Sequence, residues 1–107
     1  MTVHRLHDLV DEHLARARAA SAARSAQTIS DQGPLRQTLI ALAAGASLPE
    51  HEAPRAATLQ VLRGSARLVA NERATDLVAG DLTDIPRERH ALEALIDTAV
   101  VLTVLAD

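Results

Sequence analysis

The sequence predicts an all-β domain with an α-helix at its N-terminus. Roughly the first 26 residues have helical periodicity and contain no glycine or proline. After Leu35 the chain consists of short apolar runs of strand length, separated at regular intervals by glycine, proline or polar residues. With 107 residues, 48% of them apolar, the chain has room for one hydrophobic core, so two independent domains are not expected.

An amphipathic helix is predicted from Val3 to about Ala26. Its apolar residues recur at helical spacing, namely at Leu6, Leu9, Val10, Leu14 and Ala17. Acidic residues lie early and arginines late, which complements the helix dipole, and Glu12 can pair with Arg16 at i, i+4. This segment contains His4, His7 and His13, which are interpreted as surface residues; the alternative is that His4 and His7, at i, i+3, chelate a metal.

The helical pattern stops at the turn-forming residues Ser30 to Pro34, which are interpreted as a linker. The chain is therefore divided into a helical arm, residues 1–30, and a β-barrel, residues 31–107.

Seven strands are predicted in the second part, because seven short apolar runs follow one another there. The runs are Gln37–Ala44, Thr58–Leu62, Ala66–Ala70, Thr75–Val78, Leu82–Ile85, Ala91–Leu95 and Ala99–Leu105. Three joints between them are interpreted as hairpin turns, at residues 63–65, 71–73 and 79–81. So many short strands are expected to close into a barrel or sandwich that protects their edges.

Composition excludes several functions. The chain has no Trp, Tyr or Phe, so aromatic stacking on bases or sugars is excluded and the core is built from Leu, Val, Ile and Ala. It has no cysteine, which removes disulfides and thiolate chemistry, and no lysine, which removes Schiff-base chemistry and leaves arginine to anchor an anionic ligand. A net charge of -3 without a basic stripe argues against nucleic acid. No apolar run approaches the roughly 18 residues that span a bilayer, so a soluble, cytoplasmic protein without a membrane partner is expected.

Two glycine-anchored motifs follow each other in the second part of the chain. In the first, Gly45 is followed after five residues by His51, and Gly64 closes the motif. In the second, Gly80 is followed after five residues by Pro86, and His90 comes soon after. These motifs resemble, in order and spacing, the two motifs of the cupin superfamily, and the resemblance extends from Arg36 to Leu105. It implies a cupin-type double-stranded β-helix, that is, a jelly-roll barrel.

The same resemblance implies a metal site that is partly lost. The family usually holds a divalent transition metal such as Zn, Ni, Fe or Mn with three histidines and a glutamate, and His51 and His90 stand at two of those positions. Ala53 stands at the second histidine position, and the glutamate position falls on Ala57 or, with the longer spacing, on Thr58. Glu88 replaces the glycine of the second motif, and His90 comes one residue early. Two imidazoles leave most of a metal's coordination sphere to water, which lowers affinity.

The leading hypothesis is a small-ligand binding or sensing module whose cavity holds a compact aliphatic or anionic molecule. The residues expected to contact the ligand are His51, Gln60, His90 and Arg55. For each there is a plainer alternative: both histidines as hydrogen-bonded residues at the barrel mouth, Arg55 as an exposed loop residue, and Gln60 as an outward residue of a half-buried sheet. The competing function is a metal-dependent isomerase, decarboxylase or dioxygenase with His51 and His90 as ligands. A homodimer is expected as well, formed through edge strands and the N-terminal helix.

Overall fold

The computed structural model of the chain describes residues 1–51 and 56–105. One helix lies near the N-terminus, α1 (Leu6–Ala19), and strands make up most of the rest of the described chain. The strands are β1 (Arg24–Gln32), β2 (Leu35–Leu42), β3 (Ser47–His51), β4 (Ala56–Arg63), β5 (Ser65–Ala70), β6 (Arg73–Val78), β7 (Leu82–Asp84), β8 (His90–Ala94) and β9 (Thr98–Leu105). All pairings between neighbouring strands are antiparallel.

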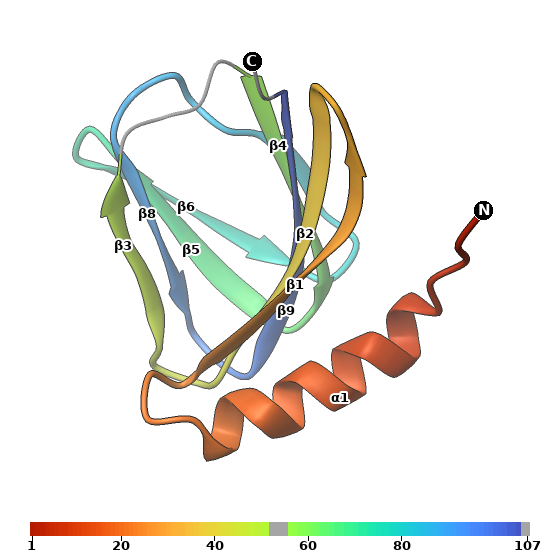
Figure 1. Cartoon of the computed structure of the whole chain (residues 1–107). Helices are drawn as coiled ribbons and strands as arrows, with labels where there is room; N and C mark the ends of the chain where they lie inside the picture. The colour runs from red at the N-terminus through yellow and green to blue at the C-terminus, as the bar shows by residue number, and fades with distance from the viewer. Residues whose placement is uncertain (52–55, 106–107) are drawn as a thin grey trace.

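The strands form two sheets that enclose one aliphatic core (Figure 1). The five-stranded sheet has the order β1-β2-β9-β4-β7, and the four-stranded sheet has the order β3-β8-β5-β6. Because side chains alternate between the faces of a strand, every second residue of each sheet points into the space between the sheets. The buried residues there are Ile40, Leu42, Leu59, Val61, Ala66, Leu68, Leu77, Ile85, Leu92, Ala94 and Val100.

All seven predicted strands are present, and two further strands were missed. The strand β1 lies in a segment that was predicted as the end of the helix and a linker, so that prediction is wrong. Polar residues face α1 from this strand, Ser25 and Gln27 among them, and they remove the apolar alternation that marks a half-buried strand. The strand β3 contains Pro49, which weakens a strand signal but is tolerated because β3 lies at a sheet edge.

One of the three predicted hairpins is confirmed, at residues 71–72 between β5 and β6. The joints at Gly64 and Gly80 are not hairpins, because each leads from one sheet to the other. A turn signal in the sequence cannot distinguish these two cases, since glycine supplies the positive φ angle that both need. A hairpin that was not predicted joins β1 to β2 across Gly33 and Pro34.

The helix α1 packs on the outer face of the five-stranded sheet, as Figure 1 shows. It contacts β1, β2 and β9. Its buried residues Val10, Leu14 and Ala17 meet a second apolar cluster made by outward-facing residues of the sheet: Leu39, Ala41, Ala99 and Val101. The predicted pair of Glu12 and Arg16 is present at 2.5 Å. The helix thus covers its own sheet, and it ends at Ala19 rather than near Ala26.

His13 lies within this interface, so its interpretation as a surface residue is wrong. Its side chain is 2% exposed. Its Nε2 donates to Oε1 of Gln27 at 2.8 Å, and its Nδ1 lies 2.6 Å from the hydroxyl oxygen of Ser25. Both ring nitrogens are therefore hydrogen-bonded, which a buried imidazole requires.

One end of the two sheets is tightly closed by turns; we call residues 43–46, 63–65 and 95–98 the closed end. Gly64 has φ of 94°, and a Cβ atom there would lie 2.3 Å from the carbonyl oxygen of Asp97. The fully buried Thr98 accepts a hydrogen bond from the backbone N–H of Ser65 at 3.1 Å. Asp97 accepts bonds from the backbone N–H of Ala44 at 2.9 Å and from Nε of Arg18 at 2.6 Å. These two bonds, the one from Ala44 first, lower the pKa of Asp97 below its usual value.

No helix in the described part of the chain is long and apolar enough to cross a membrane.

Candidate functional site

His90 is the buried ionisable residue between the two sheets. It begins β8, where alternation turns residues 90, 92 and 94 inward, and it is 4% exposed. Its Nδ1 lies 2.9 Å from the backbone carbonyl oxygen of Glu88. Because a carbonyl oxygen only accepts, Nδ1 carries a hydrogen, which in the neutral form of the ring is the Nδ1–H tautomer. The fold therefore fixes both the orientation and the tautomer of this imidazole.

A small cavity of about 40 Å³ lies beside His90 in the core. The other described residues that line it are aliphatic: Ile40, Leu48, Leu59, Leu68, Ile85, Leu92 and Leu102. A cavity holds one water molecule at about 10–15 Å³, so this one has room for very few. Among the lining residues, the imidazole of His90 supplies the polar group.

His51 ends β3, and its Cα is the register partner of His90 in the ladder between β3 and β8. Residues directly opposite each other in such a ladder lie on one face of the sheet. The fold thus brings the backbones of the two motif histidines together, although 39 positions separate them in the chain. The side chain of His51 lies outside the described part of the structure, and its role stays a prediction.

Of the other predicted ligand contacts, the structure describes Gln60, which does not lie beside His90. Gln60 is exposed between the buried Leu59 and Val61, so it points to the outer face of the five-stranded sheet and does not line the interior with His90. Of the two alternatives considered for Gln60, the structure thus shows the outward position. Arg55 lies outside the described residues. Ala57, at the expected glutamate position, packs against the core.

Glu88 connects the His90 segment to the turn between β5 and β6. Its Oε2 accepts a hydrogen bond from Nδ2 of Asn71, and its Oε1 lies 3.5 Å from Nη2 of Arg73. We call residues 71–73 and 86–90 the His90 end. The sequence indicated a turn at Asn71 but not its contact with Glu88, because tertiary contacts between such distant polar residues leave no local pattern.

A hollow of about 180 Å³ opens at the His90 end. It is lined by Leu68, Ala70, Arg73, Thr75 and Pro86. Leu68 also lines the core cavity beside His90, so the hollow and the cavity adjoin at this side chain. A guanidinium group and a hydroxyl group therefore lie in the hollow next to this cavity.

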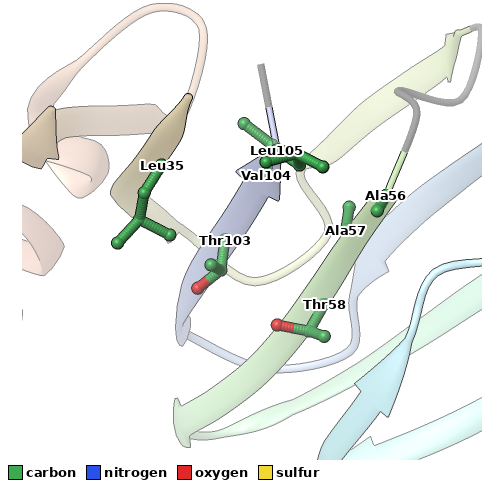
Figure 2. Close-up of a pocket in the computed structure, with 7 residues that line it drawn as sticks. All are labelled: Leu35, Ala56, Ala57, Thr58, Thr103, Val104 and Leu105. Carbon is green, nitrogen blue, oxygen red and sulfur yellow. The ribbon is translucent and has the colours of Figure 1, made fainter. Parts of the chain in front are cut away.

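A second hollow, of about 170 Å³, lies over β2, β9 and β4 (Figure 2). Its lining residues are Leu35, Ala56, Ala57, Thr58, Thr103, Val104 and Leu105. Figure 2 shows that the hydroxyls of Thr58 and Thr103 are its side-chain oxygen atoms. None of its described lining residues carries a titratable side chain.

The residues described here do not fit a metal centre. Within residues 1–51 and 56–105, no three His, Cys, Asp or Glu side chains that could be described gather closely enough to hold an ion. The tautomer of His90 is that of a typical metal ligand, whose second nitrogen donates to a carbonyl or carboxylate. One described imidazole among aliphatic side chains is nevertheless too few donors. We therefore derive no chemical step through a metal.

Comparison with solved structures shows the fold. An RmlC-like cupin protein from Desulfovibrio desulfuricans has a TM-score of 0.77 at 19% identity, and the match covers 98% of this chain and 96% of that one. A cupin superfamily protein from Desulfitobacterium hafniense has a TM-score of 0.74 at 21% identity, with 78% of each chain covered. No family model matches the sequence, and no curated protein matches it either.

An enzyme also shares the fold. Salicylate 1,2-dioxygenase from Pseudaminobacter salicylatoxidans has a TM-score of 0.77 at 20% identity, and the match covers 91% of this chain but only 33% of the enzyme. The described chain is thus a mostly β protein with the cupin fold. More particularly, its fold is that of small cupin proteins, as the resemblance carried by the two glycine motifs predicted.

Proposed function

We propose that this chain is a small-molecule binding or sensing cupin, in which a compact aliphatic or anionic ligand is held at the His90 end. The observation that supports this most is the position of His90. It is a buried imidazole whose Nδ1 donates to a backbone carbonyl, beside a cavity whose other described lining side chains are aliphatic. Pockets of this kind, mostly apolar with a few convergent polar groups, are typical of ligand sites.

The proposal includes closure of the two sheets as a jelly-roll barrel. Most connections pass from one sheet to the other, namely those after β2, β3, β4, β6, β7 and β8. Such crossing connections are typical of jelly rolls and supply an enclosed interior. In this arrangement His51, the register partner of His90, joins it at the ligand.

The ligand is small. The cavity beside His90 measures about 40 Å³ and the adjoining hollow about 180 Å³, both well below the roughly 300–1,000 Å³ of pockets for drug-sized molecules.

Ligand binding is tested by thermal-shift screening of compact aliphatic and anionic compounds against the wild type, His90→Gln and His7→Ala. His7 is an exposed histidine of α1, so its removal is the matched control. We expect hits whose stabilisation is lost in His90→Gln and kept in His7→Ala. Hits that survive in His90→Gln would contradict the proposal.

The competing function, a metal-dependent isomerase, decarboxylase or dioxygenase, is tested by metal analysis. The protein is purified without chelator or metal-affinity tag and compared with the double variant His51→Ala, His90→Ala. We expect no stoichiometric Zn, Ni, Fe or Mn in either protein, also after loading. Stoichiometric metal that disappears in the double variant would overturn the binding proposal in favour of the enzyme.

We also propose that the chain forms a homodimer. Its support is that β1, a strand of nine residues, lies at the edge of its sheet, where its backbone can pair with a second copy. Light scattering of the full chain is expected to give twice the monomer mass of 11.4 kDa. A mass equal to the monomer at all concentrations would contradict this.

A further inference from the structure

The hollow at the His90 end has the composition of a site for a small carboxylate with an aliphatic tail. Its apolar lining comes from Leu68, Ala70 and Pro86, and Thr75 contributes a hydroxyl group. The guanidinium of Arg73 is the cation among the lining residues. Arginine binds carboxylates through several N–H donors held in a planar fork. The apolar and cationic parts of the hollow thus match the two parts of such a ligand.

Arg73 already faces a carboxylate of its own chain. Its Nη2 lies 3.5 Å from Oε1 of Glu88, whereas a charge-assisted hydrogen bond is typically about 2.7–2.9 Å. A tighter pair exists on the same hairpin, where Arg67 contacts Asp76 through two bonds of 2.8 and 3.2 Å. The contact of Arg73 with Glu88 is therefore the looser of the two, and the side chain of Arg73 remains 79% exposed.

Glu88 is held in place by a different residue. Its Oε2 accepts from Nδ2 of Asn71, whose φ of 49° places it in the two-residue turn between β5 and β6. The backbone carbonyl of Glu88 accepts from Nδ1 of His90. One residue thus places a carboxylate near Arg73 and a carbonyl on the buried imidazole.

We propose that Arg73 binds the carboxylate of a short-chain aliphatic acid in this hollow, and that Glu88 is the internal carboxylate with which the ligand competes. The inference rests on the proposed function and names the ligand class and the anchoring residue of that same site. The aliphatic tail lies on Leu68 and Ala70, toward the cavity beside His90. Because the hollow of about 180 Å³ is small, butyrate, a carboxylate with a short aliphatic tail, is a suitable probe.

The test is titration of the full-length protein with sodium butyrate at constant ionic strength, followed by NMR signals of Arg73, Thr75 and the His90 ring. Removing one charge-assisted contact typically changes an equilibrium constant about tenfold, so we expect Arg73→Gln to weaken binding about tenfold. Glu88→Gln keeps an oxygen for Asn71 but removes the competing charge, and we expect it to tighten binding several-fold. Butyramide, which lacks the charge, is expected not to bind.

Arg67→Gln is the matched control, since it removes the same charge from the other face of the hairpin. It is expected to leave the affinity for butyrate unchanged. Circular dichroism and thermal unfolding establish that each variant is folded, and Arg73→Lys serves as a second variant that keeps the charge without the planar fork. We expect Arg73→Lys to bind with an affinity between those of the wild type and Arg73→Gln.

The outcomes separate this inference from the proposed function. Equal affinity in the wild type and Arg73→Gln, with a response at His90, would overturn the role of Arg73 and leave the binding function intact. Binding that depends on Arg73 without any response at His90 would support the anchor and contradict the proposed ligand position. Weaker binding in Glu88→Gln would overturn the competition, and absence of binding in both the wild type and Glu88→Gln would overturn the inference.

Discussion

The two ends of the sheets each have a buried histidine nearby, but the surroundings of the two rings differ. Near the closed end, His13 is hydrogen-bonded to the side chains of Ser25 and Gln27. It lies within the apolar interface in which α1 packs on the sheet. At the other end, His90 bonds to a backbone carbonyl and lies beside a cavity with a hollow next to it. His13 thus lies within a packed interface and serves stability, whereas His90 borders a cavity, which is the position that a binding residue needs.

The backbone shows the same contrast. Gly64, at the closed end, passes so close to Asp97 that a side chain there would overlap backbone. At the His90 end, Glu72 adopts φ of 65°, an unfavourable conformation for a residue with a side chain, beside the residues that hold Glu88. Positive φ angles at residues with side chains occur next to both ends, since Ala23, whose carbonyl accepts from Ala43 of the closed end, has φ of 58°. The close packing around Gly64 is therefore the backbone feature that distinguishes the closed end.

The largest loss in the free energy of unfolding is expected for a substitution at Gly64. Gly64→Ala places a methyl group 2.3 Å from a carbonyl oxygen and keeps a positive φ, so it should destabilise the fold by about 3 kcal/mol or more. Gly45→Ala is the control, because φ there is 84° but no atom lies within 4 Å, and it should cost about 1 kcal/mol. Urea unfolding measures both. Equal losses in the two variants would show that Gly64 is not closely packed.

A somewhat smaller loss is expected at His13. His13→Ala removes buried volume and two hydrogen bonds under α1, and should destabilise by about 2–3 kcal/mol. His7→Ala, at an exposed position of the same helix, should stay within about 0.5 kcal/mol of the wild type. Thermal and urea unfolding provide the measurement. A loss of ligand binding in a folded His13→Ala protein would contradict the division between the two histidines.

At the His90 end, substitution is expected to stabilise. Glu72→Gly relieves a positive φ in a two-residue turn whose favoured sequence is Asn-Gly, and should raise the free energy of unfolding by about 1 kcal/mol. Asn71→Gly should not do so, because asparagine tolerates this conformation and its amide donates to Glu88. A destabilised Glu72→Gly protein would show that the Glu72 side chain itself supports the turn.

The smallest effect is a pH dependence at the closed end. The pKa of Asp97 is lowered in the folded state by its bonds from Ala44 and Arg18, so its contribution to stability is present above the unfolded pKa near 3.9. That contribution is lost as pH falls through the lower folded pKa. The difference in unfolding free energy between the wild type and Asp97→Asn should therefore shrink between about pH 5 and pH 2. A constant difference over that range would mean that the carboxylate charge does not contribute.

The sequence predicted the strands that alternate and the glycines that anchor the motifs, because both depend on local patterns. It did not predict β1, because the residues that face the helix from this strand include the polar Ser25 and Gln27. The strand therefore lacks the alternation of apolar and polar residues that marks a half-buried strand. Nor did it predict the burial of His13, which depends on where the helix docks. At the site it named His51 and His90, which the ladder brings together, but it missed Arg73 and Asn71, whose contacts with Glu88 exist only in the folded chain.

The central claim, that binding belongs to the His90 end and stability to the closed end, is tested most directly by mapping where small molecules bind. Backbone and histidine NMR signals of the full chain are followed while compact aliphatic and anionic compounds are added. The account predicts that bound compounds shift the signals of His90, Leu92 and Arg73 and leave those of His13 and Thr98 in place. Signal shifts centred on His13, or on Thr58 and Thr103 in the second hollow over β2, β9 and β4, would contradict the claim that binding belongs to the His90 end.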